Sequence, residues 1–383
     1  MHPPSDTLKR RVLIVEPRVR GHLLVYVKVI AQRSLAMGDD VTLALAPGAS
    51  RTQEFLMHLA EISADVEIVE SAGVLTPRAM NVLIQETSPD FVIVPHGDEL
   101  AARLGSPFAP NLLKPTCLLV MRDPRWDSGE ALRVRMKSVL KLSLLALASK
   151  RARVRLVWLR GPFYESRSKE HFAVDPFIAD DSHRSISSKS HALRQLFPGS
   201  EDTFWFGVTG AVTRRKNLDV IIDALLELRA RELNTAFGLA VVGPIEANVL
   251  DTFEAAATRL KVAGICYYPE NRLLDNQEMN VVVASVDAVV MAYSTNAPNS
   301  TLGKAYVLGT RILSAGSRTF RAHADRLGGV SSELSPNSLC DGMQAVMRQA
   351  RPMPQPNALS SDAFADSLLR SKGHPRDSSG FSC

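Results

Sequence analysis

The stretch Phe204-Trp-Phe-Gly-Val-Thr-Gly-Ala-Val-Thr-Arg-Arg-Lys-Asn217 combines a strand, a glycine turn, two adjacent cations and a helix start. Its apolar beginning predicts a short buried strand, and Gly207 and Gly210 allow a tight turn at the carboxyl end of that strand. Asn217 fits as the N-cap of the next helix. The apolar side chains of that helix recur with helical spacing: Leu218, Ile221, Ile222, Leu225 and Leu228.

The same turn predicts an anion site. Arg215 and Lys216 place two positive charges just before a helix N-terminus, and Gly210 lets a ligand approach the backbone closely. Together these features suit a diphosphate. A basic surface turn between a strand and a helix would have the same sequence, so both interpretations stay open on this stretch alone.

The residues before this turn alternate between strands and helices. Val12–Val15 is a continuous apolar run, as in a parallel strand buried on both faces, and Gly21-His22 opens a helix that ends near Met37. The alternation predicts a doubly wound parallel sheet. Its further strands are expected at Val41–Leu45, Val66–Val69, Phe91–Val94, Cys117–Met121 and Val154–Leu159, and its further helices at about Arg51–Ile62, Pro77–Glu86 and Ser128–Lys150.

A second series of strands and helices begins at Thr203, after a segment of weak periodicity. We therefore expect an α/β protein with two Rossmann-like doubly wound domains that face a cleft. The second series has strands at Gly238–Val242, Gly264–Tyr268, Ala288–Ala292 and Arg311–Leu313, and helices at Ala247–Lys261, Asp275–Ala284 and Thr301–Leu308. The expected divisions are an N-terminal domain over 1–175, a linker over 176–200, a C-terminal domain over 201–335, helices that pack back over 336–371 and a disordered tail over 372–383.

The composition of the chain says more about its cellular compartment than about its ligand. The net charge of +5 is compatible with anionic small molecules, a membrane surface or nucleic acid. Four scattered cysteines without metal-ligand spacing favour a reducing compartment. No hydrophobic signal region precedes the first strand, and the longest apolar stretch, around Val139–Ala148, is too short to span a bilayer. These features predict a cytoplasmic protein.

The predicted helix Ser128–Lys150 is basic and amphipathic, which allows two interpretations. The helix could lie on anionic lipid, giving peripheral contact with the inner membrane face through residues 128–155. Alternatively, its cations could form the solvated face of an ordinary covering helix, which is the commoner role in α/β domains and the one we favour. The cations concerned are Arg133, Arg135, Lys137, Lys141, Lys150 and Arg151.

Ligands of doubly wound sheets sit at the carboxyl ends of the strands. In the N-terminal half this rule selects the segments Arg18–His22, His96-Gly97-Asp98 and Arg122-Asp123. Within them, the candidate site residues are Gly21, His22, His96, Asp98 and Arg122. Asp98 could equally cap the helix that follows it, which we favour slightly, and a turn histidine is otherwise unremarkable.

The stretch Tyr293–Ala315 predicts a second phosphate-binding element. Ser300 is placed to cap a helix, and the free amides of Ser300, Thr301 and Leu302 would point into the cleft. Lys304 adds a positive charge one turn later. The alternative is ordinary helix capping with a surface lysine.

With these motifs the chain resembles the GT-B glycosyltransferases, in particular those of family 4. The resemblance covers most of residues 11–335 and keeps the order of the motifs. Gly207–Asn217 is similar to the family's "G-x-x-x-x-R-K-N/G" donor loop, and Leu239–Gly243 to its "L-x-x-V-G" strand. The other similar segments are Val12–Gly21, Gly38–Ala46, Asn299–Gly309 and Arg311–Ser314.

The resemblance implies transfer of a sugar from a nucleotide-diphosphate-sugar to a glycan, lipid-linked or small-molecule acceptor, with retention of configuration and no bound metal or other cofactor. Arg215 and Lys216 would hold the diphosphate and stabilise it as it leaves. Polysaccharide biosynthesis is the expected setting, and nucleic acid is not an expected partner. The other implied donor contacts are Gly210, Asn296, Asn299, Ser300, Thr301 and Lys304; Gly21, His22, His96, Asp98 and Arg122 would face the acceptor.

The sequence departs from the family pattern at three kinds of position. Ala211 stands where the family commonly has arginine, and Arg122 where a histidine is common. Asn296 and Lys304 fall near the places of two glutamates. These differences keep two other readings open: a catalytically silent partner subunit that binds a nucleotide-sugar, and a nucleotide-sugar epimerase, which we rank last because no catalytic carboxylate pair supports it.

Overall fold

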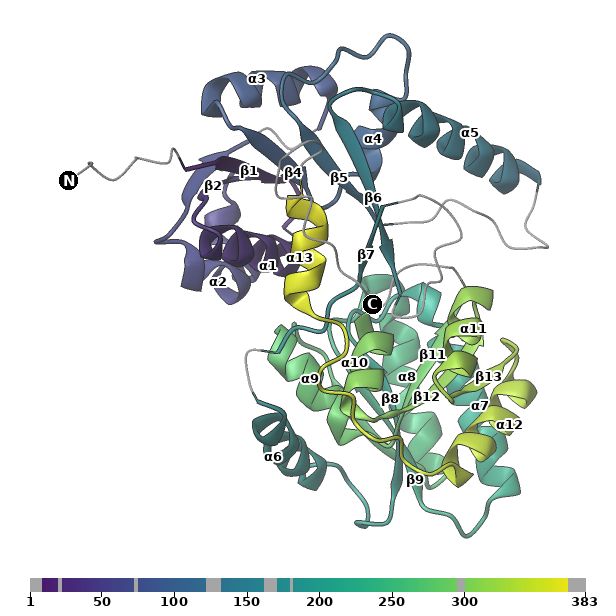
Figure 1. Cartoon of the computed structure of the whole chain (residues 1–383). Helices are drawn as coiled ribbons and strands as arrows, with labels where there is room; N and C mark the ends of the chain where they lie inside the picture. Colours follow the sequence, from purple (N-terminus) through teal and green to yellow (C-terminus); the bar gives the residue numbers. More distant parts are fainter. Residues whose placement is uncertain are drawn as a thin grey trace. The chain divides into compact units, whose positions relative to one another are not determined.

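The computed structural model describes residues 9–19, 23–71, 75–121, 132–161, 171–179, 182–294 and 300–370. The chain forms two compact units, each built on one parallel sheet (Figure 1). The first unit extends to Arg160, includes Phe172–Val174 and takes the chain from Ser361 onward. The second contains Gly161 and Asp175–Ser360.

The first unit has a seven-stranded sheet in the order β3-β2-β1-β4-β5-β6-β7. Its strands are β1 (Arg11–Glu16), β2 (Asp40–Leu45), β3 (Glu67–Glu70), β4 (Phe91–Val94), β5 (Thr116–Val120), β6 (Val154–Arg160) and β7 (Phe172–Val174). Its helices are α1 (Leu23–Ala36), α2 (Gln53–His58), α3 (Pro77–Thr87), α4 (Asp98–Leu104), α5 (Leu132–Ser149) and α13 (Ser361–Leu369). The edge strand β7 was not predicted, and the expected helix Arg51–Ile62 is split, with 3-10 turns on either side of α2.

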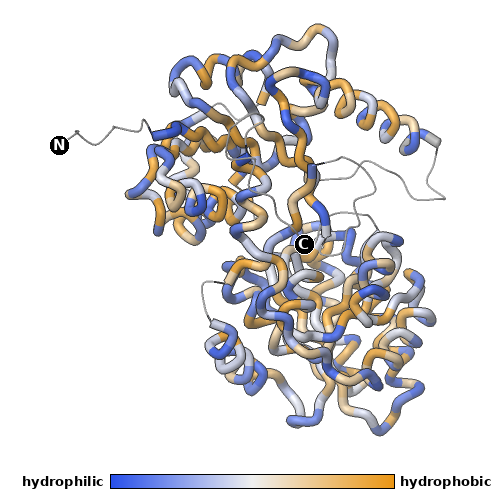
Figure 2. The backbone as a smooth tube through the Cα atoms, in the orientation of Figure 1, coloured by the Kyte–Doolittle hydropathy of each residue, from blue (hydrophilic) through white to orange (hydrophobic). Residues whose placement is uncertain are grey.

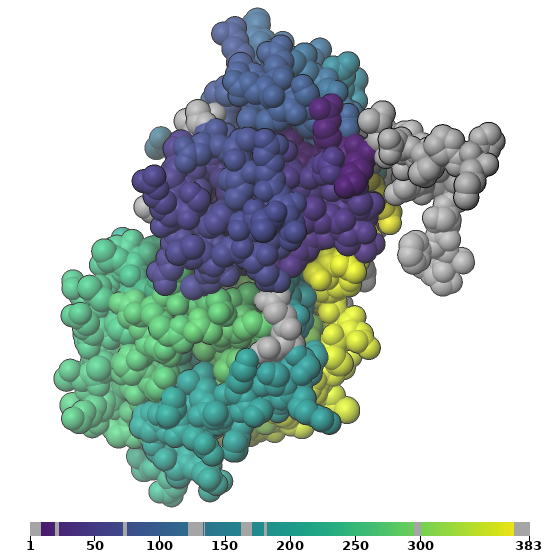
Figure 3. Space-filling model, turned by 90° about the vertical axis from the view of Figure 1, so that its left-hand side faces the viewer, coloured from purple at the N-terminus to yellow at the C-terminus, as the bar shows by residue number. Residues whose placement is uncertain are grey.

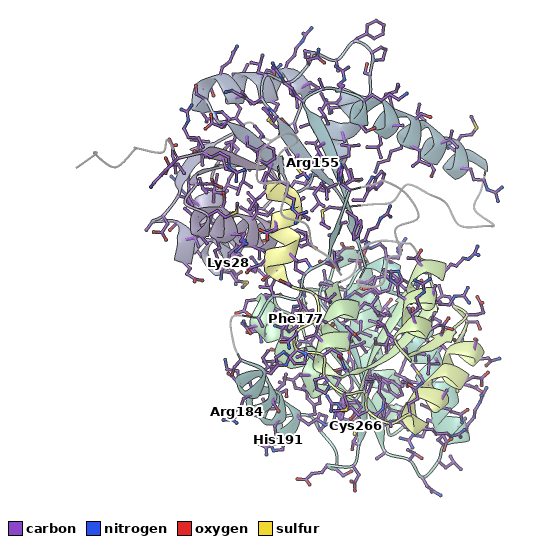
Figure 4. The ribbon with its side chains drawn as sticks, in the orientation of Figure 1. Lys28, Arg155, Phe177, Arg184, His191 and Cys266 are labelled. Carbon is purple, nitrogen blue, oxygen red and sulfur yellow. The ribbon has the colours of Figure 1, made fainter. Side chains whose placement is uncertain are left out.

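The C-terminal helix α13 completes the core of the first unit. The rings of Phe364 and Tyr26 on α1 lie 5.2 Å apart, and Asp366 pairs with Arg33 of α1 at 2.7 Å. Arg155 on β6, labelled in Figure 4, donates from its guanidinium to the carbonyl oxygen of Leu368 at 2.6 Å. The last described helix of the chain therefore stabilises the sheet that the first residues begin.

The second unit has a six-stranded sheet in the order β10-β9-β8-β11-β12-β13. Its strands are β8 (Phe204–Thr209), β9 (Phe237–Val242), β10 (Cys266–Glu270), β11 (Ala288–Tyr293), β12 (Arg311–Gly316) and β13 (Val330–Ser332). Its helices are α6 (His183–Gln195), α7 (Leu218–Arg231), α8 (Leu250–Val262), α9 (Asn276–Ser285), α10 (Ser300–Leu308), α11 (Arg318–Arg326) and α12 (Pro336–Arg348). Helix α6 packs on α9 and forms the teal surface of the second unit in Figure 3.

Burial of apolar strands on both faces holds each sheet together. On β8, Trp205 and Phe206 are 1% and 0% exposed although successive side chains of a strand point to opposite faces. The hydropathy of each residue along the two units is shown in Figure 2. Among the described residues, no helix has the length and apolar character needed to cross a bilayer.

The strand orders define where a ligand site can form. In both sheets the order reverses beside the first strand, between β1 and β4 and between β8 and β11. All strand pairs in the described residues are parallel, so the carboxyl ends of these neighbours lie at one edge. The predicted α/β class with two doubly wound sheets is confirmed, and each reversal marks the usual position of a ligand.

We expect Phe364→Ala to lower the free energy of unfolding of the first unit by about 3–5 kcal/mol, because it removes a buried ring from the α1–α13 contact. Urea unfolding followed by circular dichroism measures the change. Met353→Ala is the control, since Met353 is 81% exposed. Equal midpoints for the two variants would show that α13 does not contribute to the core.

Candidate functional site

Two glycines shape the backbone at the end of β8. Gly210 has a φ of +72° and Gly243, after β9, a φ of +139°, both unfavourable for other residues. A β-carbon on Gly243 would lie 2.6 Å from the carbonyl oxygen of Gly210. The Gly210 amide also donates to the carbonyl of Val242 at 2.9 Å. The turns after β8 and β9 therefore pack backbone against backbone.

Lys216 folds back over the end of β8. Its side chain is buried, and its Nζ donates to the carbonyl oxygens of Thr209 and, at 3.1 Å, Gly210. Burial, and to a smaller extent the charge of Arg215, lowers the pKa of Lys216 to about 7. The strand end thus carries an amino group that is held in a fixed position and poorly solvated.

Arg215 and Asn217 attach this turn to the neighbouring strand β11. The Arg215 side chain is exposed, and its carbonyl accepts from the amide of Ser294 at 3.2 Å. Asn217 occupies the N-cap position of α7, as predicted, but makes no side-chain capping bond. Its side-chain Nδ2 donates instead to the carbonyls of Arg215 and Ala292 at 2.9 and 2.8 Å, so the predicted capping interaction is wrong.

The start of α10 meets the same turn. The hydroxyl oxygens of Thr209 and Thr301 are 3.4 Å apart, and Thr301 is the second residue of α10. The first amides of a helix have no acceptor within it. The structure therefore brings Gly210, Lys216, Ser300 and Thr301 to one edge of the second sheet, where the strand order reverses.

Lys304 is buried, so the surface lysine expected in the alternative interpretation is wrong. Its Nζ donates to the Oδ1 atoms of Asn276 and Asn280 at 2.6 and 2.5 Å and lies 5.5 Å from the ring centroid of Phe177. Both asparagines donate in turn to the carbonyl of Ile178. The ammonium group of Lys304 thus joins α10 to α9.

Glu16 is a candidate site residue that sequence reasoning missed. It ends β1, is 0% exposed, and accepts from the Arg18 amide at 3.0 Å through Oε1. Its Oε2 has no hydrogen-bond partner among the residues that the structure describes. Burial raises the pKa of Glu16 to about 8, although the Arg18 amide and charge act in the opposite direction. The available signal was a carboxylic acid that ends a continuous apolar run directly before Pro17.

Asp98 does not cap α4, contrary to the interpretation that we favoured. It is the first residue of the helix, and Gly97 holds the N-cap position. Its Oδ2 accepts from the Met121 amide at 2.8 Å and its Oδ1 from Lys141 at 3.0 Å. Asp98 therefore connects α4 to the end of β5 and to α5. His96 lies half-buried in the turn between β4 and α4.

Five predicted site residues lie outside the described residues: Gly21, His22, Arg122, Asn296 and Asn299. Within the part of the chain that is described, no group of three or more histidine, cysteine or acidic side chains is arranged to hold a metal ion.

No protein-family model and no curated protein matches the chain. Several solved structures match its whole architecture. Sucrose-phosphate synthase from Thermosynechococcus elongatus aligns with a TM-score of 0.61 at 11% identity, covering 94% of this chain and 95% of that chain. HepE from Anabaena in complex with UDP aligns with a TM-score of 0.58 at 13% identity, over 93% and 94%. The chain has the GT-B fold.

Two further matches have different activities on the GT-B fold. WaaG, a glycosyltransferase involved in lipopolysaccharide biosynthesis, aligns with a TM-score of 0.56 at 15% identity, over 94% of this chain and 95% of that chain. A protein assigned as a UDP-N-acetylglucosamine 2-epimerase from Listeria monocytogenes aligns with a TM-score of 0.52 at 13% identity, over 91% and 93%. The resemblance to GT-B glycosyltransferases is thus confirmed for the fold, and activity has to be argued from the site.

We expect stability to fall with rising pH because of Glu16. The folded protein keeps the Glu16 proton up to about pH 8, whereas the unfolded chain loses it near the ordinary pKa of 4.5. The folded state therefore binds more protons in this window, and its free energy of unfolding decreases as pH rises through it. Urea midpoints measured across the window should fall in wild type relative to Glu16→Gln, which cannot ionise. Parallel pH profiles would contradict the buried, protonated carboxyl.

Proposed function

We propose that the protein is a glycosyltransferase that transfers a sugar from a nucleotide-diphosphate-sugar to an acceptor, with retention of configuration and without a bound metal. One observation carries the proposal: the buried Lys216 ammonium group lies at the end of β8, where Thr209 meets the start of α10 through Thr301. HepE, which matches this chain in fold and has been solved with UDP and with UDP-glucose, supports a nucleotide-sugar as the ligand.

The chemistry of the transfer explains these groups. When the bond between the sugar and the diphosphate breaks, negative charge builds on the diphosphate oxygens. In the proposal, Lys216 and Arg215 supply positive charge, and the amides of Ser300 and Thr301 donate hydrogen bonds. Because the glycine turn and the carbonyls of Thr209 and Gly210 already hold Lys216, little reorganisation is needed as charge develops.

Lys304 contributes differently from the direct contact with the donor that the resemblance implied. Its ammonium group is directed at two carboxamides of α9, so we assign it to positioning α10 rather than to direct contact with the diphosphate. Gly210 admits the ligand to the backbone, and Asn296 and Asn299 remain proposed donor contacts. In this assignment, the hydrogen bonds of Lys304 to Asn276 and Asn280 of α9 hold the backbone amides at the start of α10 in position.

The first unit would supply the acceptor contacts. Glu16 ends β1 and His96 follows the neighbouring strand β4, at the reversal of the first sheet. With a pKa of about 8, the buried carboxyl of Glu16 is protonated at neutral pH and can donate a hydrogen bond at the end of β1. We propose Gly21, His22 and Arg122 as further acceptor contacts, with Asp98 as a positioning residue. We propose a glycan or lipid-linked acceptor and a cytoplasmic role in polysaccharide biosynthesis. The structural match to WaaG, a glycosyltransferase involved in lipopolysaccharide biosynthesis, supports the biosynthetic setting.

We expect Arg215→Ala combined with Lys216→Ala to slow transfer by a hundredfold or more, since one preorganised donor is typically worth about 10²–10³ in rate. Nucleotide release from a panel of nucleotide-sugars in the presence of candidate acceptors measures the rate. Arg214→Ala is the matched control, because Arg214 is an exposed cation of the same turn. Rates like those of wild type in the double variant would remove these residues from the mechanism.

A second candidate is a catalytically silent subunit that binds a nucleotide-sugar. It is favoured by Lys304, which stands at the place of a family glutamate and whose ammonium group is directed at asparagines. A silent subunit should be stabilised thermally by UDP, release no nucleotide alone, and raise the rate of a neighbouring transferase. An epimerase would instead isomerise the donor without any acceptor.

A further inference from the structure

Helix α5 exposes a row of large apolar side chains. Met136 is 66% exposed, Leu140 61%, and Val139 and Leu147 each 49%. Their spacing of three, four and seven residues places them on one face of the helix. On a typical protein surface, exposed apolar side chains are scattered singly, whereas these four form one stripe.

The opposite face of α5 is fully used for packing. Leu145 and Ala148 are 1% and 0% exposed within the core of the first unit. A β-carbon on Gly105, which follows α4, would lie 2.1 Å from the carbonyl oxygen of Leu144, so the two helices are in close contact (Figure 1). Helix α5 is therefore apolar on two faces: one packs in the core of the first unit, and the other is exposed.

The charged residues of α5 itself are all positive. Arg133, Lys137 and Lys150 are exposed, and α5 contains no acidic residue. Two other cations near the helix have internal partners: Lys141 bonds Asp98, and Arg151 bonds the carbonyls of Leu104 and Ser106. The three exposed cations are thus the ones available to a partner.

We propose that this face of α5, formed by Met136, Val139, Leu140, Leu147, Arg133, Lys137 and Lys150, docks on a membrane surface that contains anionic lipids. Apolar side chains enter the boundary between headgroups and acyl chains, while flanking cations bind headgroup phosphates. A second copy of the chain fits less well, because symmetric pairing of one face would bring these like charges together. The proposal is independent of sugar transfer.

Co-sedimentation of the full chain with vesicles tests the proposal. We expect binding to phosphatidylcholine mixed with phosphatidylglycerol, little binding to phosphatidylcholine alone, and weaker binding at high salt. Arg133→Gln, Lys137→Gln and Lys150→Gln together should weaken binding on the order of a hundredfold. Met136→Ser with Leu140→Ser should also weaken it. Lys141 is left intact because it bonds Asp98.

The matched control is Lys261→Gln with Val262→Ser, an exposed cation and an exposed apolar residue at the end of α8. This pair should bind vesicles like wild type. The proposal is overturned if wild type does not co-sediment with anionic vesicles, or if the α5 variants bind as well as the control. A dimer in solution that Leu140→Glu dissociates would overturn it in favour of a second copy.

Discussion

A buried lysine at the end of the first strand of the second sheet is the feature on which the candidate site depends. Water cannot solvate the Lys216 ammonium group fully, so the carbonyls of Thr209 and Gly210 must accept its hydrogen bonds. They can do so only because Gly210 turns with a positive φ and packs against Gly243. Because the strand order reverses between β8 and β11, the N-terminus of α10 lies at the same edge of the sheet as Lys216.

Sequence predicted the features that are set locally. Phe91–Val94 was placed at its observed bounds, because this strand is apolar throughout. Strands β7 and β13 have three residues each, too few for a periodic signal. Helix α11 is mostly polar and buries only Phe320 and Ala324, so its sequence resembled a loop.

The same distinction applies to the site. The neighbourhood of Lys216 and Thr301 followed from turn and helix-start chemistry. The partners of Lys304 and Asp98 lie on other elements, more than twenty residues away along the chain, so no local pattern revealed them. Glu16 was missed because the pKa of a carboxyl depends on its burial, which the fold decides. The cations also differ in exposure, which depends on the fold. Lys216 is buried and can contact a small anion, whereas Arg133 and Lys137 are exposed and can contact an extended anionic surface.

The pKa of Lys216, measured by NMR of protein labelled with ¹³C at the lysine Cε, tests the central claim most directly. The account predicts a pKa of about 7 in the free protein, because burial disfavours the charged amine. UDP should raise that pKa, since a neighbouring diphosphate favours the ammonium form, while the resonance of exposed Lys261 stays unchanged. A pKa of Lys216 that does not move when UDP binds would contradict the account.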